Sequence, residues 1–419
     1  MAFKDSFEGL RSRLGPLAVA LAIGSAGLAT ALATSGGGAA PAPSLAPASG
    51  DGDTGPASHV SFLQKLIPPP AQKVGGPAAP RSVADLARRL PLERAVAQLF
   101  LFGFQGKDAT APVFDELRRL DLGGVVIEAR NYDSAQQLAG LASKVGAAAA
   151  HAAHIAPWVM AAQDGGEFSQ FADLPPAHPP GDFHTARGAA SAMSEAVAAL
   201  KALGINGLFE PDLDLGGAGD TPGILGRQAL SGDPALVADY AGQTVAACLA
   251  RKMFCAAKHF PGIGAASTPT DEGPAQIGLS MAALERNDVV PFAASIKAGI
   301  PGIVVGEGLY EPDSFVTPAA LSKSIIGGLL RGKLHFGGLA ITDDLADPGV
   351  SSVAQIPDAA VQALQAGADM IYISGEMGDQ EAAYNAVLNA VRSGQVSEAR
   401  VRQALLRVLL TKRGYALLR

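Results

Sequence analysis

The sequence has little charge, few aromatic residues and almost no cysteine. Charged side chains make up 17% of its 419 residues and aromatic side chains 5%, whereas 48% of the residues are hydrophobic. A disordered chain would need far fewer apolar residues and more charge, so this composition predicts a folded protein. The length allows two or three ordinary domains or one large α/β barrel.

Basic residues are too few and too scattered for a nucleic-acid surface. The chain has 32 Lys and Arg against 39 Asp and Glu, a formal net charge of −7, and no run of basic side chains. The sequence therefore offers no cluster of basic side chains that a polyanion such as a nucleic acid could bind. We expect no nucleic-acid partner.

Cysteine occurs only twice, at Cys248 and Cys255. The two stand across a predicted helix end and strand start, where Cβ directions seldom suit a disulfide. Two thiols are also too few for a metal site of the usual ligand number. We expect two buried free thiols, no metal and no other cofactor.

The first residues have the layout of a secretory signal. Lys4, Arg11 and Arg13 precede an uncharged stretch over residues 14–33, which ends in an A-x-A triplet. The stretch could also span a bilayer, although its seven Ala and three Gly make it weakly apolar. Both a cleaved signal peptide and a membrane anchor therefore fit residues 1–34.

The segment that follows is rich in proline and glycine. Residues 36–80 contain nine Pro and eight Gly, a composition that cannot bury a core and behaves as a semi-extended spacer. We expect a linker over residues 35–80 and one folded domain over residues 81–419. The protein is expected outside the cytoplasm, either secreted or anchored in a membrane through an uncleaved N-terminal segment.

From residue 82 onward, short β-type apolar runs alternate with longer helix-type segments. The eight runs cover residues 98–104, 124–129, 158–163, 207–214, 254–259, 302–306, 338–342 and 369–374. The helical segments include residues 186–203, 234–251, 281–298 and 359–366. This alternation predicts an α/β fold, a (β/α)8 TIM-type barrel. A doubly wound open sheet is the alternative, but no early strand is followed by G-x-G-x-x-G and no Walker-type motif occurs.

Polar side chains follow the predicted strands, where barrel active sites lie. They are Arg130, Asn131, Asp164, Asp214, Lys258, His259, Glu307, Asp343, Asp344 and Glu376. A single Asp after a strand often caps a helix. A whole rim of carboxylates with Lys, His and Arg instead favours hydroxylated ligands and acid/base or nucleophilic attack at an acetal carbon.

One motif resembles that of a known family. Residues 257–264, A-K-H-F-P-G-I-G, are similar to the K-H-F-P-G-H-G motif of glycoside hydrolase family 3, in its bacterial β-N-acetylhexosaminidase branch. Similar segments follow in the family's order at residues 209–214, 226–234, 341–345 and 366–370. The resemblance spans residues 82–419 and implies a barrel that hydrolyses glycans containing amino sugars.

The resemblance also implies roles for individual residues. The first Asp of the family's [ST]-D-D-L motif is the nucleophile, which corresponds to Asp343. The sugar-binding residues correspond to Lys258, His259 and Arg227, with Asp164 as a further substrate contact. A carboxylate after the seventh strand can attack the anomeric carbon and form a glycosyl-enzyme, which water then opens with retention.

The sequence departs from the family pattern at the acid/base position. The family's D-S-H triplet ends in the acid/base His, but here the aligned residues are Asp271, Glu272 and Gly273. Ala162 and Gln170 also stand where the family has a sugar-binding Asp and an Arg.

Three interpretations of these departures remain open. Asp271 or Glu272 supplies the proton, as a carboxylic acid does in most glycosidases. The substrate could instead differ from the family's usual one. The barrel could also bind glycans at the cell envelope without turnover. We expect a retaining, monomeric β-N-acetylhexosaminidase-like enzyme, with the inactive binding domain as the alternative.

Overall fold

The computed structural model describes residues 81–217 and 223–418. The predicted signal peptide or anchor at residues 1–34 and the linker at residues 35–80 lie outside the described residues. Within the part of the chain that the structure describes, no helix is both long and apolar enough to cross a membrane.

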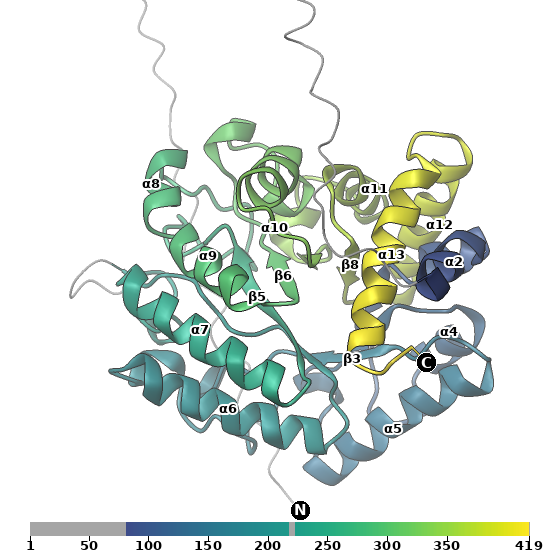
Figure 1. The fold of residues 1–419 in the computed structure, drawn as a ribbon, viewed down its shortest axis with the longest axis horizontal. Helices are drawn as coiled ribbons and strands as arrows, with labels where there is room; N and C mark the ends of the chain where they lie inside the picture. Colours follow the sequence, from purple (N-terminus) through teal and green to yellow (C-terminus); the bar gives the residue numbers. More distant parts are fainter. Residues whose placement is uncertain (1–80, 218–222, 419) are drawn as a thin grey trace, which may run out of the picture. The chain divides into compact units, whose positions relative to one another are not determined.

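Eight parallel strands pair in sequence order and close into a barrel, because β1 also pairs with β8 (Figure 1). The strands are β1 (Phe100–Phe102), β2 (Gly124–Val126), β3 (Trp158–Ala161), β4 (Gly207–Leu208), β5 (Phe254–Phe260), β6 (Gly302–Val305), β7 (Leu339–Asp344) and β8 (Met370–Ile373). Each overlaps one of the predicted apolar runs. The predicted (β/α)8 barrel is therefore confirmed.

The strands are short and almost wholly buried, as expected for a parallel sheet covered by helices. Close packing restricts the choice of residue at some positions. A Cβ atom on Gly124 would lie 2.6 Å from the Cβ of Trp158 on the neighbouring strand. Only glycine fits there without a shift of β2 or β3.

Helices lie around the ring of strands (Figure 1). The α-helices are α2 (Arg81–Arg89), α3 (Leu92–Ala97), α4 (Val113–Arg119), α5 (Ala135–His151), α6 (Ala186–Ala202), α7 (Pro234–Ala250), α8 (Met281–Arg286), α9 (Val289–Ala298), α10 (Pro348–Ser351), α11 (Ile356–Ala366), α12 (Met377–Arg392) and α13 (Glu398–Gly414). The 3-10 helices are η1 (Ala129–Asn131), η2 (Gly166–Phe168), η3 (Pro180–Asp182), η4 (Gly226–Gln228), η5 (Glu311–Asp313) and η6 (Ala319–Leu321), and η7 (Ser324–Lys333) is a π-helix.

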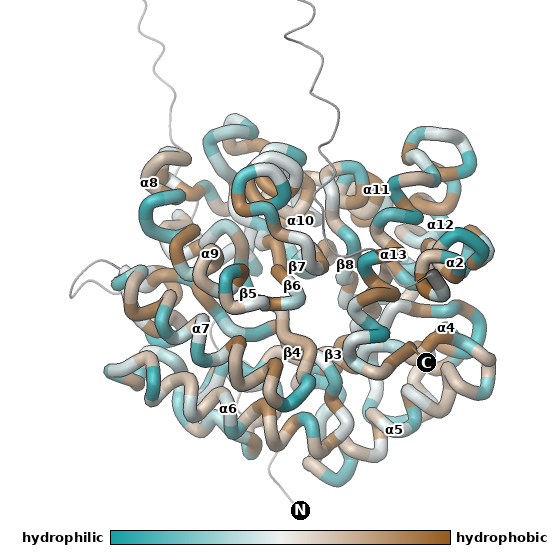
Figure 2. The backbone as a smooth tube through the Cα atoms, viewed as in Figure 1, coloured by the Kyte–Doolittle hydropathy of each residue, from teal (hydrophilic) through white to brown (hydrophobic). Residues whose placement is uncertain are grey.

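The long outer helices are amphipathic and begin at polar caps. Figure 2 shows hydrophilic and hydrophobic residues alternating along α6 and α7. The hydroxyls of Ser134, Thr185 and Ser397 accept hydrogen bonds from backbone N–H groups in the first turns of α5, α6 and α13. Such caps satisfy donors that a helix start leaves unpaired.

The helical segment expected over residues 281–298 is divided into two helices. The structure has α8 and α9, because Asn287 leaves the helical conformation with φ −120° and ψ −77°. The buried Asp288 that follows packs under the K-H-F-P-G loop. A Cβ atom on Gly262, which has φ +120°, would lie 2.7 Å from the Cβ of Asp288.

The prediction of free thiols was wrong. Cys248 in α7 and Cys255 in β5 form a disulfide, with their Cα atoms 6.3 Å apart. The chain turns between α7 and β5 tightly enough to bring the two residues into the usual range of about 4.4–6.8 Å. Element periodicity does not reveal this pairing, because it depends on the path of the turn.

The residues at and after the end of α13 cover the end of the barrel where the strands begin. The ring of Trp158, the first residue of β3, lies 4.6 Å from that of Phe254, the first residue of β5. Tyr415 packs against both rings at 5.8 Å. The buried Lys412 donates a hydrogen bond from Nζ to Oε1 of Gln98, 2.8 Å away. This end of the barrel is closed, which leaves the opposite rim for a site.

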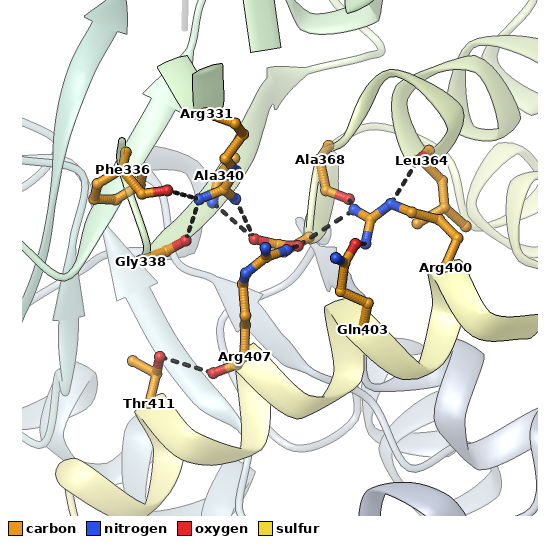
Figure 3. Close-up of polar contacts among 11 residues, drawn as sticks. Arg331, Phe336, Gly338, Ala340, Leu364, Ala368, Arg400, Gln403, Arg407 and Thr411 are labelled. Carbon is orange, nitrogen blue, oxygen red and sulfur yellow. Dashed lines mark hydrogen bonds and ion pairs between the residues drawn. The ribbon is translucent and has the colours of Figure 1, made fainter. Parts of the chain in front are cut away.

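A single carboxylate also holds α13 to the barrel. Asp369 stands directly before β8, is fully buried, and accepts hydrogen bonds from Arg331, Arg400 and Arg407 (Figure 3). Arg407 Nη1 lies 2.9 Å and Arg400 Nη2 lies 3.2 Å from Oδ1. One negative charge therefore joins η7, β8 and α13.

We predict that Asp369→Asn lowers the free energy of unfolding by about 3–5 kcal/mol, because it leaves three partly buried guanidinium groups without their counter-charge. Chemical denaturation followed by circular dichroism measures the change. Asp239→Asn, at an exposed position on α7, is the matched control. A loss below about 0.5 kcal/mol, the range of ordinary surface changes, would contradict the prediction.

Candidate functional site

The candidate site lies at the rim where the strands end. β5 carries Lys258 and His259 near its C-terminal end, β7 finishes with Asp343 and Asp344, and Asp164 follows β3 by three residues. All five side chains line one cavity of about 570 Å³, called the first cavity below. Barrel closure thus brings together residues that are up to 180 positions apart in the sequence.

A second cavity of about 330 Å³ adjoins the first. Glu272, Glu307 and Ile263 line only this second cavity, whereas Asp271 lines both. The residues that line both cavities are Phe168, Gln228, His259, Asp271, Asp343 and Asp347. The two cavities therefore form one cleft, with Asp343 on the wall between its two parts.

His259 is held between two carboxylates. Its Nδ1 donates a hydrogen bond to Asp214 Oδ2 at 2.6 Å, and its Nε2 lies 3.7 Å from Asp343 Oδ2. Asp214 is fixed in turn, because its Oδ1 accepts a hydrogen bond from the backbone N–H of Ile263. Burial alone would lower the pKa of His259, but Asp343 and Asp214 outweigh it and raise that pKa to about 10.

Lys258 is a second buried cation in the first cavity. Its Nζ lies 2.8 Å from Asp164 Oδ1 and 4.0 Å from Glu210 Oε1. Burial opposes its charge, but these carboxylates and Asp212 hold the pKa of Lys258 above its ordinary value. Burial and the neighbouring Asp164 raise the pKa of Glu210 to about 8. Lys258 is thus a fixed donor, able to bind a sugar hydroxyl.

Asp343 and Asp344 have different surroundings although they are adjacent. The side chain of Asp343 is 24% exposed and opens to the cleft. Asp344 is buried, and its Oδ1 accepts hydrogen bonds from the backbone N–H groups of Ala346 and Ser374. Asp343 is therefore free to meet a ligand, whereas Asp344 fixes the loop after β7.

Further carboxyl groups surround Asp343, and sequence reasoning missed two of them. Asp347 lines both cavities, and Glu128 lines the first, where it pairs with Arg130. Both follow strand ends closely, and Asp347 stands only three residues after the end of β7, so its place in the sequence already indicated it. Burial, together with Asp344 and then Asp343, raises the pKa of Asp347 to about 8.

Glu307 follows β6 and faces the same group of charges. Burial, followed by repulsion from Asp343 and Asp347, raises the pKa of the Glu307 carboxyl well above its ordinary value. The cleft thus carries more carboxyl groups than can all ionise at neutral pH.

Four residues expected at the site lie apart from the lining of both cavities: the rim residues Asn131, Asp214 and Glu376, and Arg227, which the resemblance suggested. Arg227 has a 56% exposed side chain and pairs with Asp182 and Glu167. Asn131 is buried and donates hydrogen bonds to backbone carbonyls after β1. Glu376 lines a different, small pocket beside α12. Strand-end position alone does not separate these roles, because each loop leaves the rim in its own direction.

The altered family positions also lie at the cleft. Ala162 and Gln170 line the first cavity, and Ile263 lines the second. Gln170 is held in place, because its Oε1 accepts a hydrogen bond from the backbone N–H of Ala129. The differences from the family pattern therefore change the surface that meets a ligand.

One group in the described ranges has the spacing of metal ligands. The ligand atoms of Asp212, Asp214 and His259 lie within 4.8 Å of one another. The hydrogen bond between His259 and Asp214 accounts for their closeness without an ion. We assign these residues to the support of the cleft.

The comparisons with known proteins agree with this geometry. A model of the glycosyl hydrolase family 3 N-terminal domain matches residues 91–411. The chain belongs to glycosyl hydrolase family 3. The family 3 assignment covers all eight strands and every residue of the cleft described above.

Individual relatives give the same family 3 result. The chain is 31% identical over 269 residues to a beta-hexosaminidase of Nitrosomonas eutropha, covering 61% of this chain and 74% of that protein. It matches the structure of a family 3 beta-N-acetylglucosaminidase from Paenibacillus with a TM-score of 0.72 and 30% identity, covering 78% of this chain and 63% of that one. A beta-N-acetylhexosaminidase structure from Beutenbergia cavernae matches with a TM-score of 0.68 and 27% identity, covering 77% of this chain and 99% of that one.

We predict that the His259 imidazole stays protonated up to about pH 10, well above its usual pKa of about 6.5. The protonated form then contributes stability that is complete below pH 6.5 and lost as the pH rises through about 10. Asp214→Asn removes one of the two carboxylates and lowers this pKa. NMR titration of the ring carbons measures both values. An unchanged pKa in the variant would contradict the prediction.

Proposed function

We propose that this chain is a retaining glycoside hydrolase for β-linked N-acetylhexosaminides, with Asp343 as the nucleophile. One observation carries the proposal: the partly exposed Asp343 carboxylate lies on the wall between two adjoining cavities. A carboxylate in that place can attack the anomeric carbon of a sugar whose glycosidic bond crosses from one cavity to the other. The names of the relatives suggest an N-acetylhexosamine as that sugar.

The first cavity would hold the reacting sugar. Lys258 offers hydrogen-bond donors and Asp164 offers acceptors, and each fixes the other by an ion pair. The imidazolium of His259 would attract and orient Asp343, whose Oδ2 lies 3.7 Å from its Nε2. Arg227 would act on the sugar through Glu167, which lines the cavity and pairs with Arg227.

A carboxyl group that lines the second cavity would supply the proton. Asp271 lines both cavities, and Glu272 lines only the second. Either carboxyl group can give its proton to the leaving oxygen as the bond to the anomeric carbon breaks, and then take a proton from the water that opens the glycosyl-enzyme. The position of Asp271 at the junction favours it over Glu272.

We also propose that the enzyme is a monomer that works outside the cytoplasm. The support for a location outside the cytoplasm is the sequence of residues 1–34, which suits a signal peptide or an anchor, and the linker composition of residues 35–80 before the domain at 81–419. Intact-mass measurement of the mature chain distinguishes cleavage from an uncleaved anchor.

We predict that Asp343→Ala lowers hydrolysis of an aryl N-acetyl-β-glucosaminide by about 10³-fold or more, because the variant lacks the carboxylate that would form the glycosyl-enzyme. A slow fluorinated substrate should label Asp343 in the parent, as read by peptide mass spectrometry. Asp239→Asn is the matched control, and thermal unfolding checks that each variant folds. Activity of Asp343→Ala equal to the parent would contradict the proposal, and a parent that binds glycans without hydrolysing them would favour the binding domain.

We predict that Asp271→Asn slows hydrolysis of an N-acetylglucosamine disaccharide by about 10²–10⁴-fold, the usual contribution of a proton donor. The same variant should lose far less activity on an aryl glycoside, whose good leaving group needs little protonation. Glu272→Gln should change both rates less than Asp271→Asn does. If both variants behave like the parent on both substrates, neither residue is the acid.

A further inference from the structure

This inference rests on the proposed function, which places the second cavity on the side of the leaving group. The sugar that leaves must lie beside the proton donor, on the far side of the scissile bond from the reacting sugar. Asp271 and Glu272 both line the second cavity, and Asp343 lies at its border with the first. The second cavity is therefore the place for the leaving sugar.

The walls of the second cavity are strongly unbalanced in charge. Its carboxyl side chains are Asp271, Glu272, Glu307, Asp343 and Asp347. His259 is the single cationic side chain among its described lining residues, and it is already engaged with Asp214 and Asp343. The excess of carboxyl groups has no counter-charge from the lining.

Glu307 gives a second, independent observation. The residue is only 2% exposed, and neither of its carboxyl oxygens has a hydrogen-bond partner in the part of the chain that the structure describes. Buried polar groups in native proteins are nearly always paired, because an unpaired one loses its hydration without compensation. A carboxyl group left in this state at a cavity wall is a ready acceptor for a ligand that brings N–H donors and positive charge.

The spread of these oxygens argues against a small metal ion. Among the residues that the structure describes, the only three ligand-type side chains whose atoms come within 4.8 Å of one another are Asp212, Asp214 and His259. The carboxyl groups of the second cavity do not converge in this way. They line a volume of about 330 Å³, which suits a charged organic group better than a bare ion.

We propose that the second cavity binds the protonated amine of an unacetylated amino sugar as the leaving residue. The substrate class is then a β-linked chain in which an N-acetylhexosamine is followed by a residue with a free amine, as in a partly deacetylated glycan. The bound ammonium group would favour the charged form of the Asp347 and Glu307 carboxyl groups, so that both give up their protons on binding and provide the counter-charge. An N-acetyl group at the same place is neutral and would leave these carboxyl groups unpaired.

The test compares two disaccharides at about pH 6, where the free amine is protonated. Both have N-acetylglucosamine as the reacting residue, and the second residue is either glucosamine or N-acetylglucosamine. We expect kcat/KM to be about tenfold higher for the glucosamine compound, the effect of one net favourable ion pair. Asp347→Asn and Glu307→Gln should each reduce this ratio at least threefold, and Glu195→Gln, at an exposed position on α6, should leave it unchanged.

An aryl N-acetylglucosaminide, which has no second sugar, separates this inference from the proposed function. If the aryl compound is hydrolysed but the two disaccharides react equally, the function stands and the amine site is overturned. A preference that survives both variants, or Ca²⁺ binding that depends on the same residues, also overturns it. If the parent hydrolyses nothing, calorimetric binding of the two disaccharides gives the same ratio without turnover. The thermal unfolding of Glu307→Gln shows whether that buried variant folds, and Asp347→Asn tests the inference independently.

Discussion

Closure of eight parallel strands into one barrel is the constraint on which the rest of the structure depends. Because all strands run the same way, their C-terminal ends meet at one rim. Asp164 after β3, Lys258 on β5 and Asp343 on β7 therefore face one cleft. The opposite end of the barrel is filled by Trp158 and by residues at and after the end of α13, including Tyr415.

The rim is rich in carboxyl groups that lie close enough to repel one another. Two cations in the lining, Lys258 and His259, are each held by carboxylates and remain charged. Burial, followed by mutual repulsion, raises the pKa of the remaining carboxyl groups at Asp347 and Glu307. Near neutral pH, Asp347 and Glu307 therefore favour their protonated forms in the unliganded cleft.

Much of the fold could be predicted because it depends on local periodicity. All eight strands and the helix boundaries near Ala186 and Pro234 follow from apolar runs and caps. The break between α8 and α9, where Asn287 leaves the helical conformation, does not show in the apolar periodicity of residues 281–298. The disulfide of Cys248 depends on the path of one turn. Neither the helix break nor the disulfide is recorded in the apolar periodicity of the sequence.

For the site, the sequence by itself determined which chemical groups stand at the ends of the strands. The motif around Lys258 and the pair of Asp residues at β7 are visible without coordinates. Only the tertiary structure decided which of these groups share a cavity: it turned Arg227 toward Asp182, and it brought Asp347 and Glu307 to Asp343. The physical reason is that loop direction, burial and electrostatic repulsion depend on neighbours that are distant in sequence, and no local pattern records them.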